Sequence, residues 1–156
     1  ELAQGKIKLN IELKPADNSE ELARKTVALI EKYNMENDCV ITSFSSSALS
    51  AAKSCDENIR VGYILSAAYG EYYDMKNIDF FSVNAAFLSK RTIDAIHNSG
   101  KQVYAWTVNN KDSIKNLTNK GVDGVITDNP VLARETIYSR DTSETIINMI
   151  RYVFNQ

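Results

Sequence analysis

Residues 6–14 read KIKLNIELK, with an apolar side chain at every second position from Ile7 to Leu13. Such strict alternation is typical of a β-strand. Because neighbouring side chains of a strand point to opposite faces, Glu12 and Lys14 share the polar face, about 7 Å apart along the strand. On a surface strand this pattern is ordinary. In a parallel βα barrel it would direct a carboxylate and an ammonium group into one pocket, so Glu12 is either a solvent-exposed residue or a ligand.

Composition bounds the class of protein. The chain has 156 residues, of which 44% are hydrophobic and 24% charged, with a net charge of −2, so we expect one globular domain. No basic block suggests nucleic-acid binding. No apolar run approaches the ~20 residues of a membrane span, and no signal peptide opens the chain. Cys39 and Cys55 form no C-x-x-C motif, and we interpret them as free thiols.

Six segments predict β-strands, and most of the gaps between them carry helical patterns. The strands are Ile7–Leu13, Cys39–Ser43, Val61–Leu65, Phe80–Val83, Gln102–Val108 and Gly124–Thr127. Repeated βα units favour a parallel sheet, either doubly wound or closed as a barrel. The turn after the first strand, KPADNSEE, is not a glycine-rich phosphate loop, which argues against a dinucleotide-binding fold.

Three helices are predicted with their ends. Asn18 or Ser19, Ser89 and Asn110 are residues that cap helix N-termini, and Gly121 is placed to end the third helix. The apolar positions that we expect on these helices are Leu22, Leu29, Ile30 and Tyr33, then Ile93 and Ile96, then Ile114 and Leu117. Residues 141–156 add a capping-box pattern and an apolar stripe, which predict a terminal amphipathic helix.

Polar residues gather where the predicted strands end. Glu12 and Lys14 lie at the end of the first strand, and the later strand ends carry Ser43, Asn84, Thr107, Asn109, Thr127 and Asp128. In a βα barrel the carboxyl ends of the strands build the active site. Five polar strand ends that point the same way therefore favour a functional site there.

The motifs, taken in order, resemble the glycerophosphodiester phosphodiesterase family. They are LNIELK (9–14), ITSF (41–44), RVGYIL (60–65), FFSVN (80–84), VYAWTVN (103–109) and GVDGVITDNP (121–130). The resemblance implies a TIM barrel, which has eight strands and typically about 250 residues. LNIELK corresponds to the third strand and GVITDNP to the eighth. We therefore expect an incomplete α/β barrel of six βα units, strands 3–8, over residues 1–140, followed by the terminal helix over 141–156.

The same resemblance implies a function for the parent enzyme. The family hydrolyses glycerophosphodiesters to glycerol phosphate and an alcohol, with two histidines as general acid and base and a divalent cation, Ca²⁺ or Mg²⁺, on three carboxylates. The histidines and two carboxylates belong to the first two strands, which this sequence lacks, so we expect no catalytic residue here and an inactive fragment. Glu12 maps onto the third metal ligand. Lys14, Trp106 and Phe44 are the expected substrate-binding residues, although a Phe in the position of Phe44 more often belongs to the core.

The only histidine, His97, is predicted near the end of a helix, at the opposite end of the sheet from Glu12. Interaction with the helix C-terminus or plain exposure is the expected role there. Asn84, Thr107 and Asn109 either shape the pocket or cap the turns that follow them. Capping is the expected role of Asn109 and Asn110, and Asp128 is expected to cap the helix after Pro130.

Partners follow from the missing strands and from a tyrosine cluster. Two open parallel edges, at Ile7–Leu13 and Gly124–Thr127, invite a homodimer, a swapped assembly or closure by the terminal helix. Tyr69, Tyr72 and Tyr73 follow the third strand of this chain, where they form either a membrane-contacting cluster or a packed loop. We expect a soluble fragment of a parent that is cytoplasmic or membrane-associated.

Two alternatives remain open at this point. One is another TIM-barrel phosphodiesterase, of the phosphoinositide phospholipase type. The other is a non-catalytic binding or assembly module, which would also lack catalytic histidines. The sequence upstream of Glu1 would discriminate between the enzyme and the module.

Overall fold

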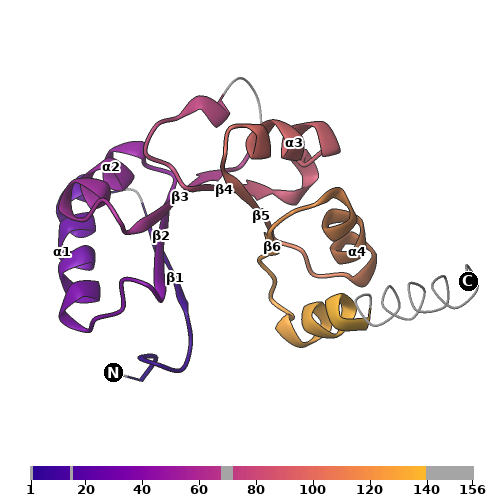
Figure 1. Ribbon diagram of the computed structural model, residues 1–156, viewed down its shortest axis with the longest axis horizontal. Helices are drawn as coiled ribbons and strands as arrows, with labels where there is room; N and C mark the ends of the chain where they lie inside the picture. The colour runs from indigo at the N-terminus through magenta and orange to yellow at the C-terminus, as the bar shows by residue number, and fades with distance from the viewer. Residues whose placement is uncertain (1, 15, 68–71, 140–156) are drawn as a thin grey trace, which may run out of the picture.

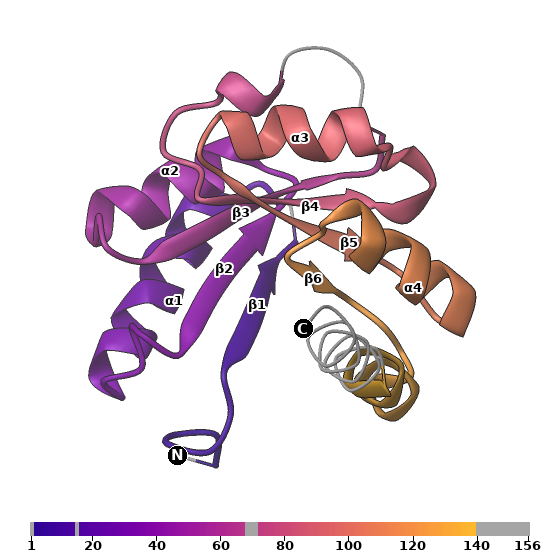
Figure 2. The ribbon, with the colours of Figure 1, turned by 45° about the vertical axis from the view of Figure 1, so that its right-hand side comes forward.

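The structure, a computed structural model, describes residues 2–14, 16–67 and 72–139. Within them a six-stranded parallel sheet runs in chain order, each strand beside the next (Figure 1). The strands are β1 (Leu9–Leu13), β2 (Cys39–Ser43), β3 (Arg60–Leu65), β4 (Phe80–Asn84), β5 (Gln102–Trp106) and β6 (Gly124–Val125). The sheet curves, and its helices lie on the convex side (Figures 1 and 2). The expected terminal helix over 141–156 lies outside the described residues.

All six predicted strands are present, with shorter ends in three cases. β1 starts at Leu9 because the amide groups of Lys6 and Ile7 donate to the carbonyl oxygen of Ala3 in a turn, at 2.9 and 3.1 Å, instead of entering the ladder. Ile7 is accordingly 62% exposed. β5 ends at Trp106, and β6 pairs with it over two residues only.

Four α-helices cover the convex face between successive strands. They are α1 (Ser19–Lys32), α2 (Ser46–Cys55), α3 (Lys90–Asn98) and α4 (Lys111–Lys120); the 3₁₀ turns are η1 (Tyr72–Asp74) and η2 (Ala85–Phe87), and residues 130–139 are helical. Two predicted caps are confirmed. Ser89 accepts from the amide of Thr92 at 3.1 Å and Asn110 from that of Ser113 at 2.8 Å. Gly121 ends α4 in the left-handed region, at φ 95°.

The start of α1 and two of its four expected apolar positions differ from the expectation, while Ile30 is buried as expected and Tyr33 packs against the core. Asn18 precedes the helix without a side-chain cap, and the Ser19 hydroxyl bonds to Ala16 instead. Leu22 and Leu29 are 37% and 55% exposed. The buried stripe is Ser19, Ala23, Val27 and Ile30. This helix therefore presents small and β-branched residues to the sheet and to α2, and leaves two leucines on its outer surface.

The connection between β3 and β4 contains η1 and no α-helix in its described part. The Tyr72 ring packs edge-on against Phe81, with centroids 5.3 Å apart, and against Tyr73 at 5.7 Å. Burial raises the pKa of Tyr72 above its ordinary value. These two tyrosines are half-buried and belong to a packed loop; Tyr69 lies outside the described residues.

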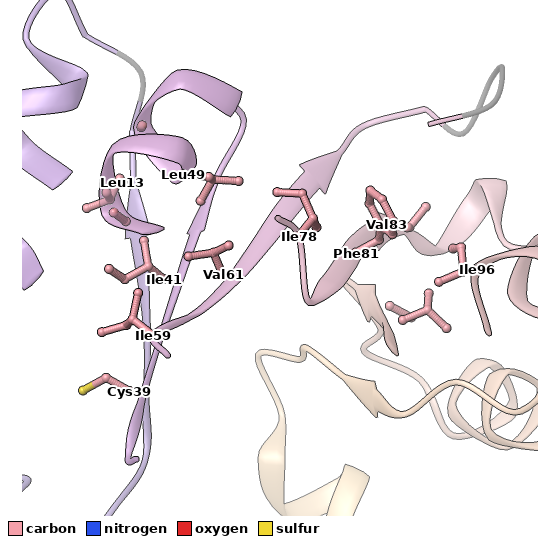
Figure 3. Close-up of a cluster of buried hydrophobic side chains, with 14 of the residues drawn as sticks. Leu13, Cys39, Ile41, Leu49, Ile59, Val61, Ile78, Phe81, Val83 and Ile96 are labelled. Atoms are coloured by element: carbon pink, nitrogen blue, oxygen red, sulfur yellow. The ribbon is translucent and has the colours of Figure 1, made fainter. Parts of the chain in front are cut away.

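The main core lies between the sheet and the helices (Figure 3). Its strands contribute Leu13, Ile41, Val61, Phe81, Val83 and Val103, all nearly inaccessible to solvent. Both cysteines are free: Cys39 is buried in this core and Cys55 is exposed. Burial raises the pKa of the Cys39 thiol.

Two aspartates accept hydrogen bonds from backbone amides near the amino ends of β3 and β5. Asp79 accepts from the amide of Val61 at 2.7 Å and pairs with Lys53 at 2.9 Å. Asp123 accepts from the amide of Val103 at 2.8 Å and lies 2.9 Å from Nε2 of His97. His97 is thus at the amino end of the sheet, as predicted, with a partner that the sequence pattern did not reveal.

Replacing Asp123 by alanine should lower the free energy of unfolding by about 1–3 kcal/mol, because the amide of the buried residue Val103 loses its acceptor. His97→Ala should cost less than about 1 kcal/mol, since it removes only a partly exposed partner. Urea denaturation of both variants measures the difference. An equal loss in the two variants would place the stabilising contact in the His97–Asp123 pair rather than in the backbone bond.

Candidate active site

The concave face of the sheet carries the side chains that do not face the helices. On the part of this face near the amino ends of the strands, the Phe80 side chain fills the interior and is fully buried. Its ring lies 4.8 Å from that of Tyr104 and 5.7 Å from the Arg60 guanidinium, which bonds to Gln102. Gly62 opposite provides the space, because a Cβ there would lie 2.1 Å from the ring. A second hollow of about 340 Å³ lies at the amino ends of the strands, where its lining includes Asn10, Arg60 and Tyr104. The Phe80 cluster forms a floor below the half of the concave face that opens towards the carboxyl ends.

A pocket of about 290 Å³ occupies that open half. Its polar wall comes from β1 and β2, as Asn10, Glu12 and Thr42, and its apolar wall includes Phe44, Trp106 and Ile126. Three of the four predicted site residues therefore line a single cavity. Lys14 follows Leu13 at the end of β1, is exposed, and is not part of the lining.

Glu12 is the ionisable residue of this wall. It is exposed to the pocket side and has no hydrogen bond or ion pair with any described residue, Lys14 included. Its neighbours on the same face are bonded to each other: the Thr42 hydroxyl donates to Oδ1 of Asn10 at 3.0 Å. The ladder pairs Glu12 with Thr42. The carboxylate is therefore available to bind a ligand.

The apolar wall is an aromatic pair. The rings of Phe44 and Trp106 meet edge to face with centroids 6.2 Å apart. The indole N–H of Trp106 donates to the carbonyl oxygen of Ser82 at 2.9 Å, which fixes the ring plane. Phe44 is 39% exposed, so it belongs to the pocket surface and not to the core. The peptide bond that links Trp106 to Thr107 is cis.

At the rim of the pocket, beyond β6, two expectations about helix capping are wrong. Asn109 does not cap α4; its side chain bonds to Thr127 and Asp128. Asp128 does not cap the following helix, because Asn129 accepts from the amide of Leu132 at 3.1 Å. Asn129 directly precedes Pro130, which is the first residue of the helix. An Asn in this position is a capping signal that the sequence contained. The contacts of Asn109 with the segment after β6 had no such signal.

A divalent cation prefers several oxygen ligands. Among the residues that the structure describes, no three His, Cys, Asp or Glu side chains come together. Glu12 alone does not complete such a site.

Taken together, fold and pocket define an open βα half-barrel with a site at the carboxyl ends of its strands, the architecture of TIM-barrel proteins. The model of the glycerophosphoryl diester phosphodiesterase family matches residues 2–132, and the chain belongs to that family. The resemblance drawn from the motifs is confirmed.

Known proteins similar to this chain carry related names. A glycerophosphodiester phosphodiesterase of Caldanaerobacter subterraneus subsp. tengcongensis is 25% identical over 133 residues, which cover 83% of this chain and 49% of the relative. A structure of an Oleispira antarctica phosphodiesterase with the product sn-glycerol-3-phosphate is 27% identical, with a TM-score of 0.75 over 83% of this chain and 55% of that one. A Parabacteroides distasonis glycerophosphodiester phosphodiesterase, 20% identical, has a TM-score of 0.80 over 88% and 60% of the two chains.

The chain spans about half the length of the curated relatives that it matches. Within its described residues, no helix has the length and apolar character needed to cross a membrane.

Proposed function

We propose that the complete protein containing this chain is a metal-dependent phosphodiesterase that hydrolyses glycerophosphodiesters to glycerol phosphate and an alcohol. The observation that carries the proposal is the carboxylate of Glu12, which bonds to no described residue and lines one pocket together with the aromatic pair of Phe44 and Trp106. Family membership and the half-length match support the view that the chain comprises strands 3–8 of an eight-stranded barrel.

Each residue has a role in this proposal. Glu12 is one oxygen ligand of a divalent cation, Ca²⁺ or Mg²⁺, which when bound stabilises negative charge on the phosphate. Lys14, at the end of β1, offers an ammonium group to the same phosphate. Phe44 and Trp106 hold the carbon skeleton of the substrate. The acid and base come from outside the described residues, because His97 lies at the amino end of the sheet, bonded to Asp123.

The test is a substitution in the complete protein. Glu12→Ala should lower metal-dependent release of glycerol phosphate by at least about a hundredfold, because loss of a residue that only hydrogen-bonds to a metal ligand already costs about 10–100-fold. Glu135→Ala, an exposed glutamate on the helix over 130–139, is the matched control and should leave the rate unchanged. Full activity of the Glu12 variant, or no activity in the parent, would contradict the proposal. Inactivity of the parent would favour the non-catalytic module.

Open edges predict how the chain behaves alone. In the described sheet, β1 and β6 each pair on one side only (Figure 2), and Ile7 beside β1 is 62% exposed. We propose that these edges pair with a second chain, as a dimer or a swapped assembly. Sedimentation should show concentration-dependent association, and Ile7→Lys should weaken it by placing a charge beside the edge. A monodisperse monomer whose β1 amides exchange slowly would indicate closure by its own chain.

A further inference from the structure

The pocket wall after β6 lies where the backbone pairing of the sheet ends. Only Gly124 and Val125 pair with β5, opposite Tyr104 and Ala105. The next residue, Ile126, lines the pocket. Its carbonyl oxygen accepts from the amide of Val108 at 2.9 Å, and its own amide donates to the carbonyl oxygen of Ala105 at 2.8 Å. The ladder ends there, so whatever follows must be held by side chains.

Asn109 supplies that support from the end of the neighbouring strand. Its Oδ1 accepts from the amide of Asp128 at 2.9 Å and from the hydroxyl of Thr127 at 3.1 Å. Its Nδ2 donates to Oδ2 of Asp128 at 2.7 Å. The Thr127 hydroxyl in turn accepts from the amide of Asn129, the residue that caps the helix over 130–139. One amide thus connects β5 to the start of that helix.

We propose that Asn109 is a positioning residue of the pocket: by holding Thr127 and Asp128, it keeps the preceding residue Ile126 in the wall beside Trp106 and Thr107. The role requires a side chain of this length with both a donor and an acceptor. Aspartate lacks the donor and would face the carboxylate of Asp128, and alanine lacks both groups. This role rests on the proposed function only in that the pocket is taken to bind the substrate. The contacts of Asn109 are tested by a measurement that needs no enzyme activity.

Trp106 provides the readout, because it is the only tryptophan of the chain and lines the pocket. Acrylamide quenching of its fluorescence is measured on the purified chain, at a temperature where circular dichroism shows every variant fully folded. Asn109→Ala and Asn109→Asp should raise the quenching constant by about twofold, through local opening of the wall. The double variant Asn109→Asp/Asp128→Asn exchanges donor and acceptor and should return the constant to the parent value. Thr127→Val, which removes one of the three bonds, replaces Asn109→Ala if that variant does not fold.

The matched control is Asn110→Ala, which removes the cap of α4 one residue away and leaves the Asn109 bonds in place. Quenching should not change in this variant, although its melting temperature falls. Three results would overturn the inference: unchanged quenching in the Asn109 variants, an equal rise in Asn110→Ala, or a double variant that stays as accessible as Asn109→Asp. None of them bears on whether the complete protein hydrolyses phosphodiesters, which the Glu12 assay decides separately.

Discussion

Residues 1–156 purified alone should release no glycerol phosphate from glycerophosphodiesters, with or without added Ca²⁺ or Mg²⁺. Cleavage needs a proton donor for the leaving oxygen and an activated nucleophile. The only histidine, His97, is held by Asp123 at the opposite end of the sheet from Glu12. A single carboxylate in the pocket is also too few ligands for a tightly bound cation.

The assay compares the unsubstituted chain of residues 1–156 with its Glu12→Ala variant at equal concentration. Both should match the buffer blank. Metal-dependent release by the unsubstituted chain above the Glu12→Ala background would show that residues 1–156 contain all the catalytic residues. The proposal that the site is divided between two parts of a barrel would then be wrong. Activity that is equal in both preparations would instead identify a contaminating enzyme.

The second large effect is expected at Gly62, where alanine should lower the free energy of unfolding by about 1–3 kcal/mol or more through overpacking. An added Cβ would lie 2.1 Å from Cε2 of Phe80. The ring has little room to move, because it is fully buried between Tyr104 and Arg60. The substitution therefore forces the floor of the pocket apart.

Urea denaturation measures this effect, and a melting temperature lower by about 2–4 °C per kcal/mol should accompany it in a chain of this size. Phe80→Leu supplies the matched control, since the smaller side chain relieves the clash. The loss in Gly62→Ala/Phe80→Leu should be clearly smaller than the sum of the two single losses. Additive losses would mean that Gly62 is needed for its backbone and not for the space beside Phe80.

Local patterns predicted the elements because their signals are local. The alternation in residues 6–14 predicted β1 and its two faces. Ser89 and Asn110 cap their helices because a short polar side chain reaches its own first turn. The same logic failed for α1, where leucines were expected inside. Which stripe of that helix is buried depends on the surfaces of the sheet and of α2, and these favoured Ala23 and Val27 over Leu22 and Leu29.

In the candidate site too, some residues were predicted from local motifs and others were identified only in the structure. Glu12 and Trp106 were predicted from the family motifs, and Glu12 also from its position on a strand. The structure alone identified the carbonyl oxygen of Ser82 as the partner of the Trp106 N–H. The contacts of Asn109 were not found, because Thr127 and Asp128 lie 18 and 19 residues further along the chain. A side-chain amide that bonds to its own turn and one that bonds to the next strand look identical in a sequence.

By itself, the sequence determined the parallel βα order, the family and the candidate residues Glu12, Lys14, Phe44 and Trp106, since these depend on periodicity and on ordered motifs. The tertiary structure decided which of them meet. It brought Glu12, Phe44 and Trp106 to one pocket and left Lys14 outside its lining. It also closed the floor with Phe80 over Gly62. The physical reason is that curvature of the sheet and packing across strands set distances between residues far apart in the chain, and no local pattern encodes those distances.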